Sequence, residues 1–289
     1  GGGIAIGPAM QVRLMDVAAD AQTLAASMNH AAFNLVNAIG AWLGGMVLAV
    51  GFGREATGWG GMEGSLGGVG LGGAGPSGRI ARQAADEYAP GKHPVSAITT
   101  DAEAASYERG VADRQALKFG EHDMMLAVTV SGKTPWVWGA MRHAWSLGSP
   151  VAVMTGDAQS EAAQLASMVI APELGPDVVA GHANAKAGIA QKMILNMVTT
   201  GLAVRSGRVY SNLRVDLEAT STKWSERQIA IVMEAGGCTR AEAKAALESC
   251  NHNCKTAVLM VLTGLDAWKA HELLAQNNGF IRVALQEAP

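Results

Sequence analysis

The sequence is poor in aromatic residues, in cysteine and in clustered basic charge. Aromatic residues make up 5% of its 289 positions, so we expect a core packed with alanine, valine, leucine and methionine. The formal charge is −3 and no basic stripe is present, which argues against a nucleic-acid-binding protein. Three cysteines without a disulfide-like spacing fit a reducing compartment. These deficits favour a cytoplasmic protein.

The cysteines also supply too few ligands for a metal centre. Cys250, His252 and Cys254 resemble a metal-binding cluster in their spacing. If this stretch is one helix, however, the two cysteines share a face and the histidine points away from them. A structural zinc ion needs four converging ligands. We therefore expect these cysteines to be core or surface residues and not metal ligands.

Charged residues are missing altogether from Ala21 to Gly53. Within this stretch, residues 31–53 (AAFNLVNAIGAWLGGMVLAVGFG) form an apolar run long enough to cross a bilayer. Gly40 and Gly44 have the small-residue spacing that lets membrane helices approach closely. A buried helix of a soluble protein is the alternative. The sequence thus predicts an N-terminal apolar helical segment.

This N-terminal text resembles the C-terminal part of major-facilitator efflux transporters. The resemblance is carried by GPAMQVRLMDVAADAQTLAASMNHAAFNLVNAIGAWLGGMVLAVGFG and extends over about residues 1–72. It implies a loop followed by membrane helices, and hence a segment that contacts or inserts into a membrane. The segment is too short to form a transport path alone. We interpret it as a fused or misassembled fragment.

The next informative stretch runs from Asp123 to Leu147. An apolar run, Met124–Val130, has the length of a buried parallel strand, and a polar loop follows it. In α/β sheets, ligands bind where strands end and helices begin. The hydroxyls of Ser131 and Thr134, the Lys133 ammonium and the free N–H groups of the following helix could converge on an anion. An ordinary polar turn is the alternative, because the Walker spacing is absent.

A similar turn occurs earlier, in Gly73–Glu87 (GAGPSGRIARQAADE), where Pro76-Ser77-Gly78 opens another predicted helix. The strand expected before it is weak, since only Val69 and Leu71 offer packing side chains. Further strands and helices alternate downstream, which predicts a doubly wound parallel sheet. We expect these elements to be a loop from residue 93, a helix over 102–115, a strand over 150–155, a helix over 161–167, a strand over 169–172 and a helix over 188–204.

The C-terminal residues, 223–289, are predicted to form a small all-α bundle of three helices. Thr239 and Glu242 have the spacing of a capping box at the start of the first helix. A second helix is expected from about Asn253 to Val261, and a third over Leu265–Gln276. Gly237 and Gly264 mark helix ends.

From about Gly73 onward, the chain resembles the N-acetylmuramic acid 6-phosphate etherase family, which has the sugar-isomerase (SIS) fold. The matching text includes SGKTPWVWGAMRHAWSLG, KAGIAQKMILNMVTTGLAVRSGRVYSNLRVDLEAT and GCTRAEAKAALESCNHNCKTAVLMVL. The resemblance implies three parts: a transporter-like segment (1–72), an SIS phosphosugar-binding domain (73–222) and a helical C-terminal subdomain (223–289).

The resemblance also implies a reaction. A lyase of this family cleaves the D-lactyl ether of N-acetylmuramic acid 6-phosphate by β-elimination and water addition. Carboxylates can supply the base and the acid, so the resemblance implies that no cofactor is required. Glu87 stands in ADEYAP, where the family has a catalytic glutamate. The segment with the family's second glutamate is shorter here, which leaves Glu103 and Glu108 as candidates.

The family's phosphate-binding loops match several positions of this chain. They imply a substrate-binding set of Ser77, Gly78, Ser131, Gly132, Lys133, Thr134 and Lys186. Lys133 replaces an arginine, which keeps the charge but loses the bidentate geometry. The resemblance further implies a homodimer with a small-molecule sugar phosphate as ligand.

Two other functions remain open at this point. One is a regulator that binds a sugar phosphate on the same fold without turnover, which the altered catalytic segment favours. The other is a fragment of a membrane efflux transporter, which residues 1–72 suggest.

Overall fold

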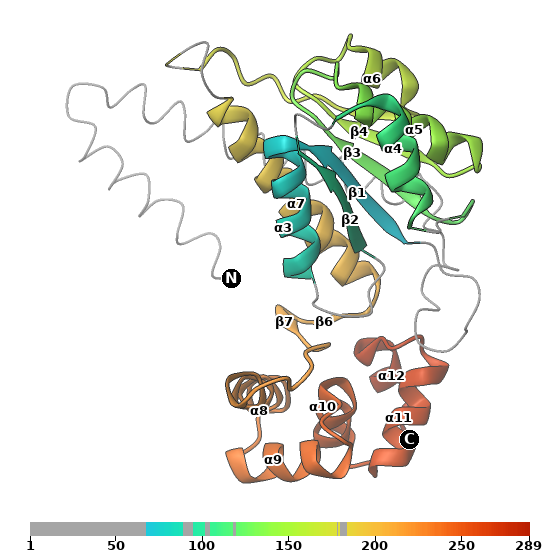
Figure 1. The fold of residues 1–289 in the computed structure, drawn as a ribbon. Helices are drawn as coiled ribbons and strands as arrows, with labels where there is room; N and C mark the ends of the chain where they lie inside the picture. Colours follow the sequence, from blue (N-terminus) through green and yellow to red (C-terminus); the bar gives the residue numbers. More distant parts are fainter. Residues whose placement is uncertain (1–67, 89–94, 102–104, 118–119, 178, 180–183) are drawn as a thin grey trace, which may run out of the picture. The chain divides into compact units, whose positions relative to one another are not determined.

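The computed structural model describes residues 68–88, 95–101, 105–117, 120–177, 179 and 184–289 (Figure 1). The predicted transporter-like segment lies almost entirely outside these residues. None of the helices in the described ranges combines the length and hydropathy needed to cross a bilayer.

The α/β part is built on a five-stranded parallel sheet with the order β2-β1-β3-β4-β5. Every neighbouring pair is parallel. The sequence-based prediction of a parallel sheet with alternating helices is therefore confirmed. The strands are β1 (Val69–Ala74), β2 (Val95–Thr100), β3 (Met124–Val128), β4 (Val151–Met154) and β5 (Met168–Ile170).

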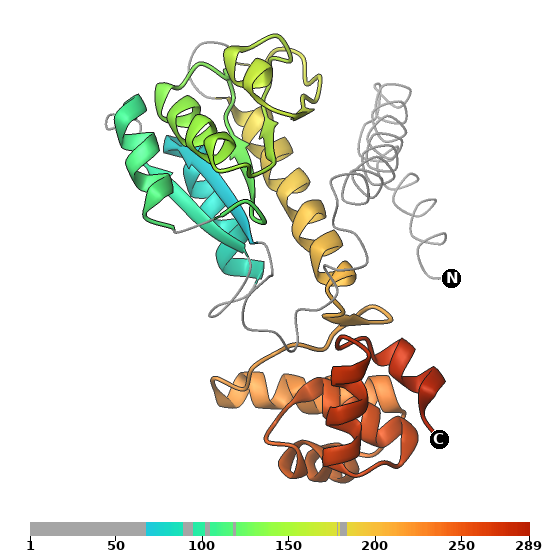
Figure 2. The same ribbon diagram turned by 90° about the vertical axis from the view of Figure 1, so that its right-hand side faces the viewer.

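Helices cover both faces of this sheet (Figures 1 and 2). On one face, α3 (Gly75–Tyr88) packs beside α7 (Ala185–Arg205). On the other face, α4 (Tyr107–Gln115) packs on α5 (Pro135–Ser146), and α5 contacts α6 (Glu161–Leu165). The buried core on this second face includes Trp136 and Met141.

Strand β1 is central, although its sequence predicts a poor strand. It pairs with β2 on one side and β3 on the other, so the boundary expected at residue 72 falls inside it. Its glycines allow helix α3 to lie close against it. A Cβ on Gly78 would sit 2.5 Å from the carbonyl oxygen of Gly73, so these two backbones touch. Glycine is needed here for close approach of the backbones.

Strand β2 was not predicted, because residues 93–101 were interpreted as a loop. It is an edge strand in which only Val95 and Ile98 are buried, so its hydrophobic signal is weak. The helix expected from Ala102 begins instead at Tyr107, with Ser106 as its N-cap.

Helices α4 and α5 are in backbone contact. A Cβ on Gly110 would lie 2.0 Å from the carbonyl oxygen of Trp136, and one on Gly139 would lie 2.1 Å from that of Tyr107. The Trp136 carbonyl cannot move without disturbing the helix packing, because Trp136 is fully buried. This contact fixes the start of α5, where the anion-binding turn was predicted.

Replacing Gly110 or Gly139 with alanine should therefore destabilise the fold by about 3 kcal/mol, at the upper end of overpacking effects. The matched control is Gly201→Ala in α7, where nothing lies within 4 Å of the added Cβ. That change should be neutral or stabilising by up to about 1 kcal/mol, because alanine favours helix. Urea unfolding of the three variants measures this, and equal midpoints would contradict the backbone contact.

A two-stranded hairpin, β6 (Val209–Tyr210) with β7 (Leu213–Arg214), follows α7 and leads to the helical subdomain. The subdomain has five helices where three were predicted, since the first and last were not anticipated. The five helices are α8 (Thr222–Gly236), α9 (Arg240–Ser249), α10 (Cys254–Thr263), α11 (Ala267–Gln276) and α12 (Ile281–Glu287). Helix α10 contacts each of the other four.

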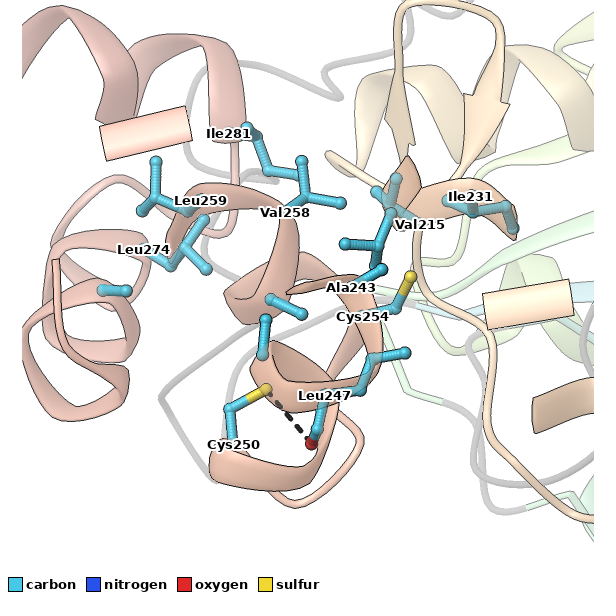
Figure 3. Packing of buried hydrophobic residues seen from close by; sticks show 14 of the residues in the cluster. Val215, Ile231, Ala243, Leu247, Cys250, Cys254, Val258, Leu259, Leu274 and Ile281 are labelled. Carbon is cyan, nitrogen blue, oxygen red and sulfur yellow. Dashed lines mark hydrogen bonds between the residues drawn. The ribbon is translucent and has the colours of Figure 1, made fainter. Parts of the chain in front are cut away.

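The predicted capping box of Thr239 and Glu242 is present. The single helix considered for Cys250 to Cys254 is not formed, because positive φ angles at Asn251 and His252 separate α9 from α10. Both cysteines pack in the subdomain core (Figure 3), which is one of the two locations expected for them. Burial raises the pKa of the Cys254 thiol to about 12.

Candidate functional site

A cavity of about 480 Å³ opens at the carboxyl ends of β1 and β3. Ala74 and Val128, the last residues of these strands, line it. In the order 2-1-3-4-5, the chain leaves β1 toward one edge of the sheet and leaves β3 toward the other. This switch point is where open α/β sheets bind ligands.

Three helices begin at this cavity. Pro76 and Ser77 of α3, Thr134 before α5, and Asn184 and Ala185 at the start of α7 all line it. The first-turn N–H groups of a helix have no partner within that helix, and the helix dipole favours negative charge there. None of the described lining residues is titratable. The cavity therefore suits an anion held by neutral donors.

The turn after β3 is fixed by its own side chains. The Gly132 N–H donates to Thr129 Oγ1 (3.2 Å), and the Lys133 N–H donates to Ser131 Oγ (3.2 Å). Trp138 Nε1 donates to the Gly132 carbonyl (2.9 Å). Thr134 makes no side-chain capping bond, and both its side chain and that of Ser131 reach the cavity. The two hydroxyls thus lie where a ligand would meet them.

The remaining predicted binding residues take different places. Ser77 is buried at the cavity and donates its hydroxyl hydrogen to Gln191 Oε1 (3.1 Å). Gly78 packs α3 against β1 and is not a lining residue. Lys133 is exposed and does not line the cavity.

Lys186 lines a second cavity of about 600 Å³, which meets the first at Val130 and Asn184. Its ammonium donates to the carbonyl of Pro176 (2.6 Å). The carboxylates of Asp157 and Glu173 also border this second cavity. Lys186 is therefore engaged in holding the 172–177 loop against α7.

The two predicted catalytic carboxylates that the structure describes, Glu87 and Glu108, do not line the first cavity. Glu87 lies in the last turn of α3, ten residues after Ser77, or about 15 Å along the helix. It forms an ion pair with Lys192, whose ammonium lowers the pKa of the Glu87 carboxyl. Glu108 is exposed in the first turn of α4, and Glu103 lies outside the described residues.

Sequence reasoning missed two polar residues of the cavity, Asn184 and Gln191. Gln191 is 4% exposed and lies in the helix predicted from Gly188, where it interrupts an otherwise apolar run. That interruption was the available signal. Asn184 sits in the loop before the same helix and carried no recognisable pattern.

Comparison with known proteins finds curated relatives that are named as N-acetylmuramic acid 6-phosphate etherases. No family model matches it. It is 50% identical over 177 residues to the N-acetylmuramic acid 6-phosphate etherase of Klebsiella aerogenes, covering 61% of this chain and 59% of that one. It is 43% identical over 229 residues to the etherase of Aliivibrio fischeri strain MJ11, covering 74% and 76%.

Among solved structures, an Escherichia coli CFT073 protein in complex with A5P aligns with 17% identity and a TM-score of 0.42, covering 50% of this chain and 74% of that one. The Vibrio vulnificus NanR protein complexed with ManNAc-6P aligns with 19% identity and a TM-score of 0.37, covering 47% and 48%. Because 76% of the Aliivibrio relative is matched at 43% identity, the chain belongs to the N-acetylmuramic acid 6-phosphate etherase family.

Proposed function

We propose that the chain cleaves the D-lactyl ether of N-acetylmuramic acid 6-phosphate, as a carbon–oxygen lyase. The observation that supports this most directly is the uncharged cavity at the switch point, where three helix starts face one space. A phosphate ester bound there is held by backbone N–H groups and by the hydroxyls of Ser131 and Thr134. Membership of the etherase family supports the identity of the sugar. The α/β part is then an SIS-type phosphosugar-binding domain.

The catalytic help that the proposed reaction requires from the protein is proton transfer by an acid and a base. In the open-chain aldehyde, the carbonyl at C1 acidifies the proton at C2, and a base removes it. The C2–C3 double bond forms as the C3–O bond breaks, and an acid protonates the departing lactate oxygen. Water then adds at C3 and a proton returns to C2. Carboxylates with suitably placed neighbours perform both roles.

In this proposal the base comes from a second copy of the chain. The described lining of the cavity has no titratable side chain, and Glu87 lies about 15 Å along α3 from Ser77. Glu87 therefore serves a substrate held by a partner, which accounts for the expected homodimer. Glu108 and Glu103 stay candidates for the acid.

A single pair of measurements tests the proposal. The full chain is incubated with N-acetylmuramic acid 6-phosphate, and released D-lactate is measured with a coupled assay. Binding of the same compound is followed by calorimetry. We expect both binding and lactate. Binding without lactate would identify the second candidate, a phosphosugar-binding regulator, which is favoured by the finding that none of the lining residues in the described ranges is titratable. Absence of binding would overturn both.

The N-terminal segment keeps its predicted role as a transporter-like fragment that contacts a membrane. Because β1 includes Val69 and Leu71, the phosphosugar domain starts before residue 73. The rest of the chain is expected in the cytoplasm. Fractionation of cells expressing the full chain and a chain starting at residue 54 tests whether residues 1–53 direct it to membranes.

A further inference from the structure

One polar side chain at the cavity comes from neither phosphate-binding turn. Gln191 of α7 is 4% exposed and lines the cavity opposite Ser77 of α3, which is 6% exposed. The two side chains are joined by a buried hydrogen bond, in which Ser77 Oγ donates to Gln191 Oε1 (3.1 Å). They are 114 residues apart in sequence and meet because α3 and α7 pack side by side.

This bond determines which end of the amide faces the ligand. The Oε1 atom of Gln191 is occupied by the Ser77 hydroxyl hydrogen. The Nε2 group carries two donors, and in the described residues no protein acceptor is recorded for it. Gln191 Nε2 is not among the buried side-chain atoms that lack a hydrogen-bond partner, so it is accessible from the cavity that Gln191 lines and is open to a ligand. The Nε2 group is therefore an anion donor, and Ser77 retains only acceptor capacity.

We propose that Gln191 is a specificity-determining residue that presents its Nε2 donors to the oxyanion, while Ser77 acts as a positioning residue that fixes the orientation of the amide. The proposal rests on the proposed function, since it concerns the same cavity. It makes the site selective for a fully ionised oxyanion. If the ligand oxygen carried a hydrogen, that hydrogen would face the Nε2 hydrogens of Gln191, and binding would be weaker. The sequence-based role of Ser77, a hydroxyl that donates to phosphate, is replaced by an indirect one.

The discriminating variant is Gln191→Glu, which keeps the shape and the acceptor for Ser77. At neutral pH its carboxylate replaces the two donors with a negative charge, so sulfate binding should fall about 10- to 100-fold, the value of a hydrogen bond to a charged group. As pH falls, the carboxyl gains a hydrogen and becomes a donor again. Affinity should then recover in this variant and stay flat in the wild type. Sulfate is the probe because its charge is constant between about pH 5 and 8.

Two further variants separate positioning from folding. Gln191→Leu removes the amide without adding charge, and should weaken sulfate binding at every pH. Ser77→Ala should weaken binding in the wild-type background but have no added effect in Gln191→Leu, because Ser77 acts through the amide. Gln164→Glu on α6 is the matched control, being exposed and outside the cavity lining. Thermal unfolding of each variant confirms that it is folded.

The outcomes are distinct. Unchanged sulfate binding in Gln191→Glu, a loss without pH recovery, or additive effects of Ser77→Ala and Gln191→Leu would each overturn the role of Gln191 while the wild type still binds phosphosugar. A wild-type chain that binds neither sulfate nor phosphosugar would overturn the proposed function together with it.

Discussion

Replacing Glu87 with glutamine is expected to reduce D-lactate release about 10²- to 10⁴-fold, the usual contribution of a general acid or base. Glutamine has the same shape but cannot accept the C2 proton. Binding of the phosphosugar should stay within about twofold, because Glu87 lies about 15 Å along α3 from Ser77 in the same chain. Asp86→Asn, the adjacent exposed carboxylate on α3, is the matched control and should leave both quantities unchanged. Unaltered turnover in Glu87→Gln would remove this residue from the mechanism.

The ion pair with Lys192 gives this prediction a pH signature. The Lys192 ammonium lowers the pKa of the Glu87 carboxyl, so the carboxylate is the form present at neutral pH. If Glu87 is the base, activity is lost at low pH as this group protonates. Lys192→Met removes the cause of the lowered pKa, so the midpoint of the acidic limb should move to higher pH. Loss of an ion pair this exposed should change the free energy of unfolding by less than about 1 kcal/mol. A limb that does not move would contradict the assignment.

Mixing two inactive variants tests whether the base crosses between copies. One partner carries Glu87→Gln with an intact cavity, and the other carries Ser131→Ala with Thr134→Val and an intact Glu87. Mixed dimers then contain one complete site, so activity should return to about a quarter of the wild type when half of the dimers are mixed. No recovery would mean that each chain uses its own Glu87.

The sequence predicted those parts of the fold that carry a local signal. The apolar run before Ser131 and the capping box at Thr239 each need only neighbours along the chain, and both are found. Strand β2 was missed because, as an edge strand, it buries only Val95 and Ile98. The strength of β1 was underestimated for a different reason. Its glycines look unfavourable locally, yet they are required by the close approach of α3, which is a tertiary contact.

The candidate site also contains residues that have a local sequence signal and residues that only tertiary contacts bring together. The turn that carries Ser131 and Thr134 was predicted because a turn between a strand and a helix can be recognised in sequence, and both residues line the cavity. Gln191 was missed because its partner, Ser77, is 114 residues away and only helix packing brings them together. The predicted carboxylates show the converse problem. Sequence resemblance proposed Glu87 as a catalytic residue but could not show that, within one chain, α3 carries it away from the cavity.

The second large effect is expected from Gly132→Ala, which should abolish phosphosugar binding and destabilise the α/β part. Gly132 has a φ of +68°, where alanine is strained, and an added Cβ would lie 2.1 Å from Ser160 Oγ. Ser160 cannot turn away freely, because its hydroxyl donates to the Asp157 carbonyl (2.7 Å) and caps α6. The turn must therefore shift, which displaces the hydroxyls that line the cavity.

Gly237→Ala separates the backbone strain from the steric clash. Gly237 has a similar φ of +63°, but nothing lies within 4 Å of its added Cβ, and it caps α8 in the helical subdomain. The Gly237→Ala variant should lose about 1–2 kcal/mol of the free energy of unfolding and leave phosphosugar binding intact.

The double variant Gly132→Ala with Ser160→Gly removes the clash but keeps the strain, so it should recover part of the binding. Calorimetric titration with the phosphosugar and urea unfolding measure both effects. If Gly132→Ala binds as tightly as Gly237→Ala, the turn at Ser131–Thr134 does not hold the ligand, and the anion must be bound by the starts of α3 and α7 alone.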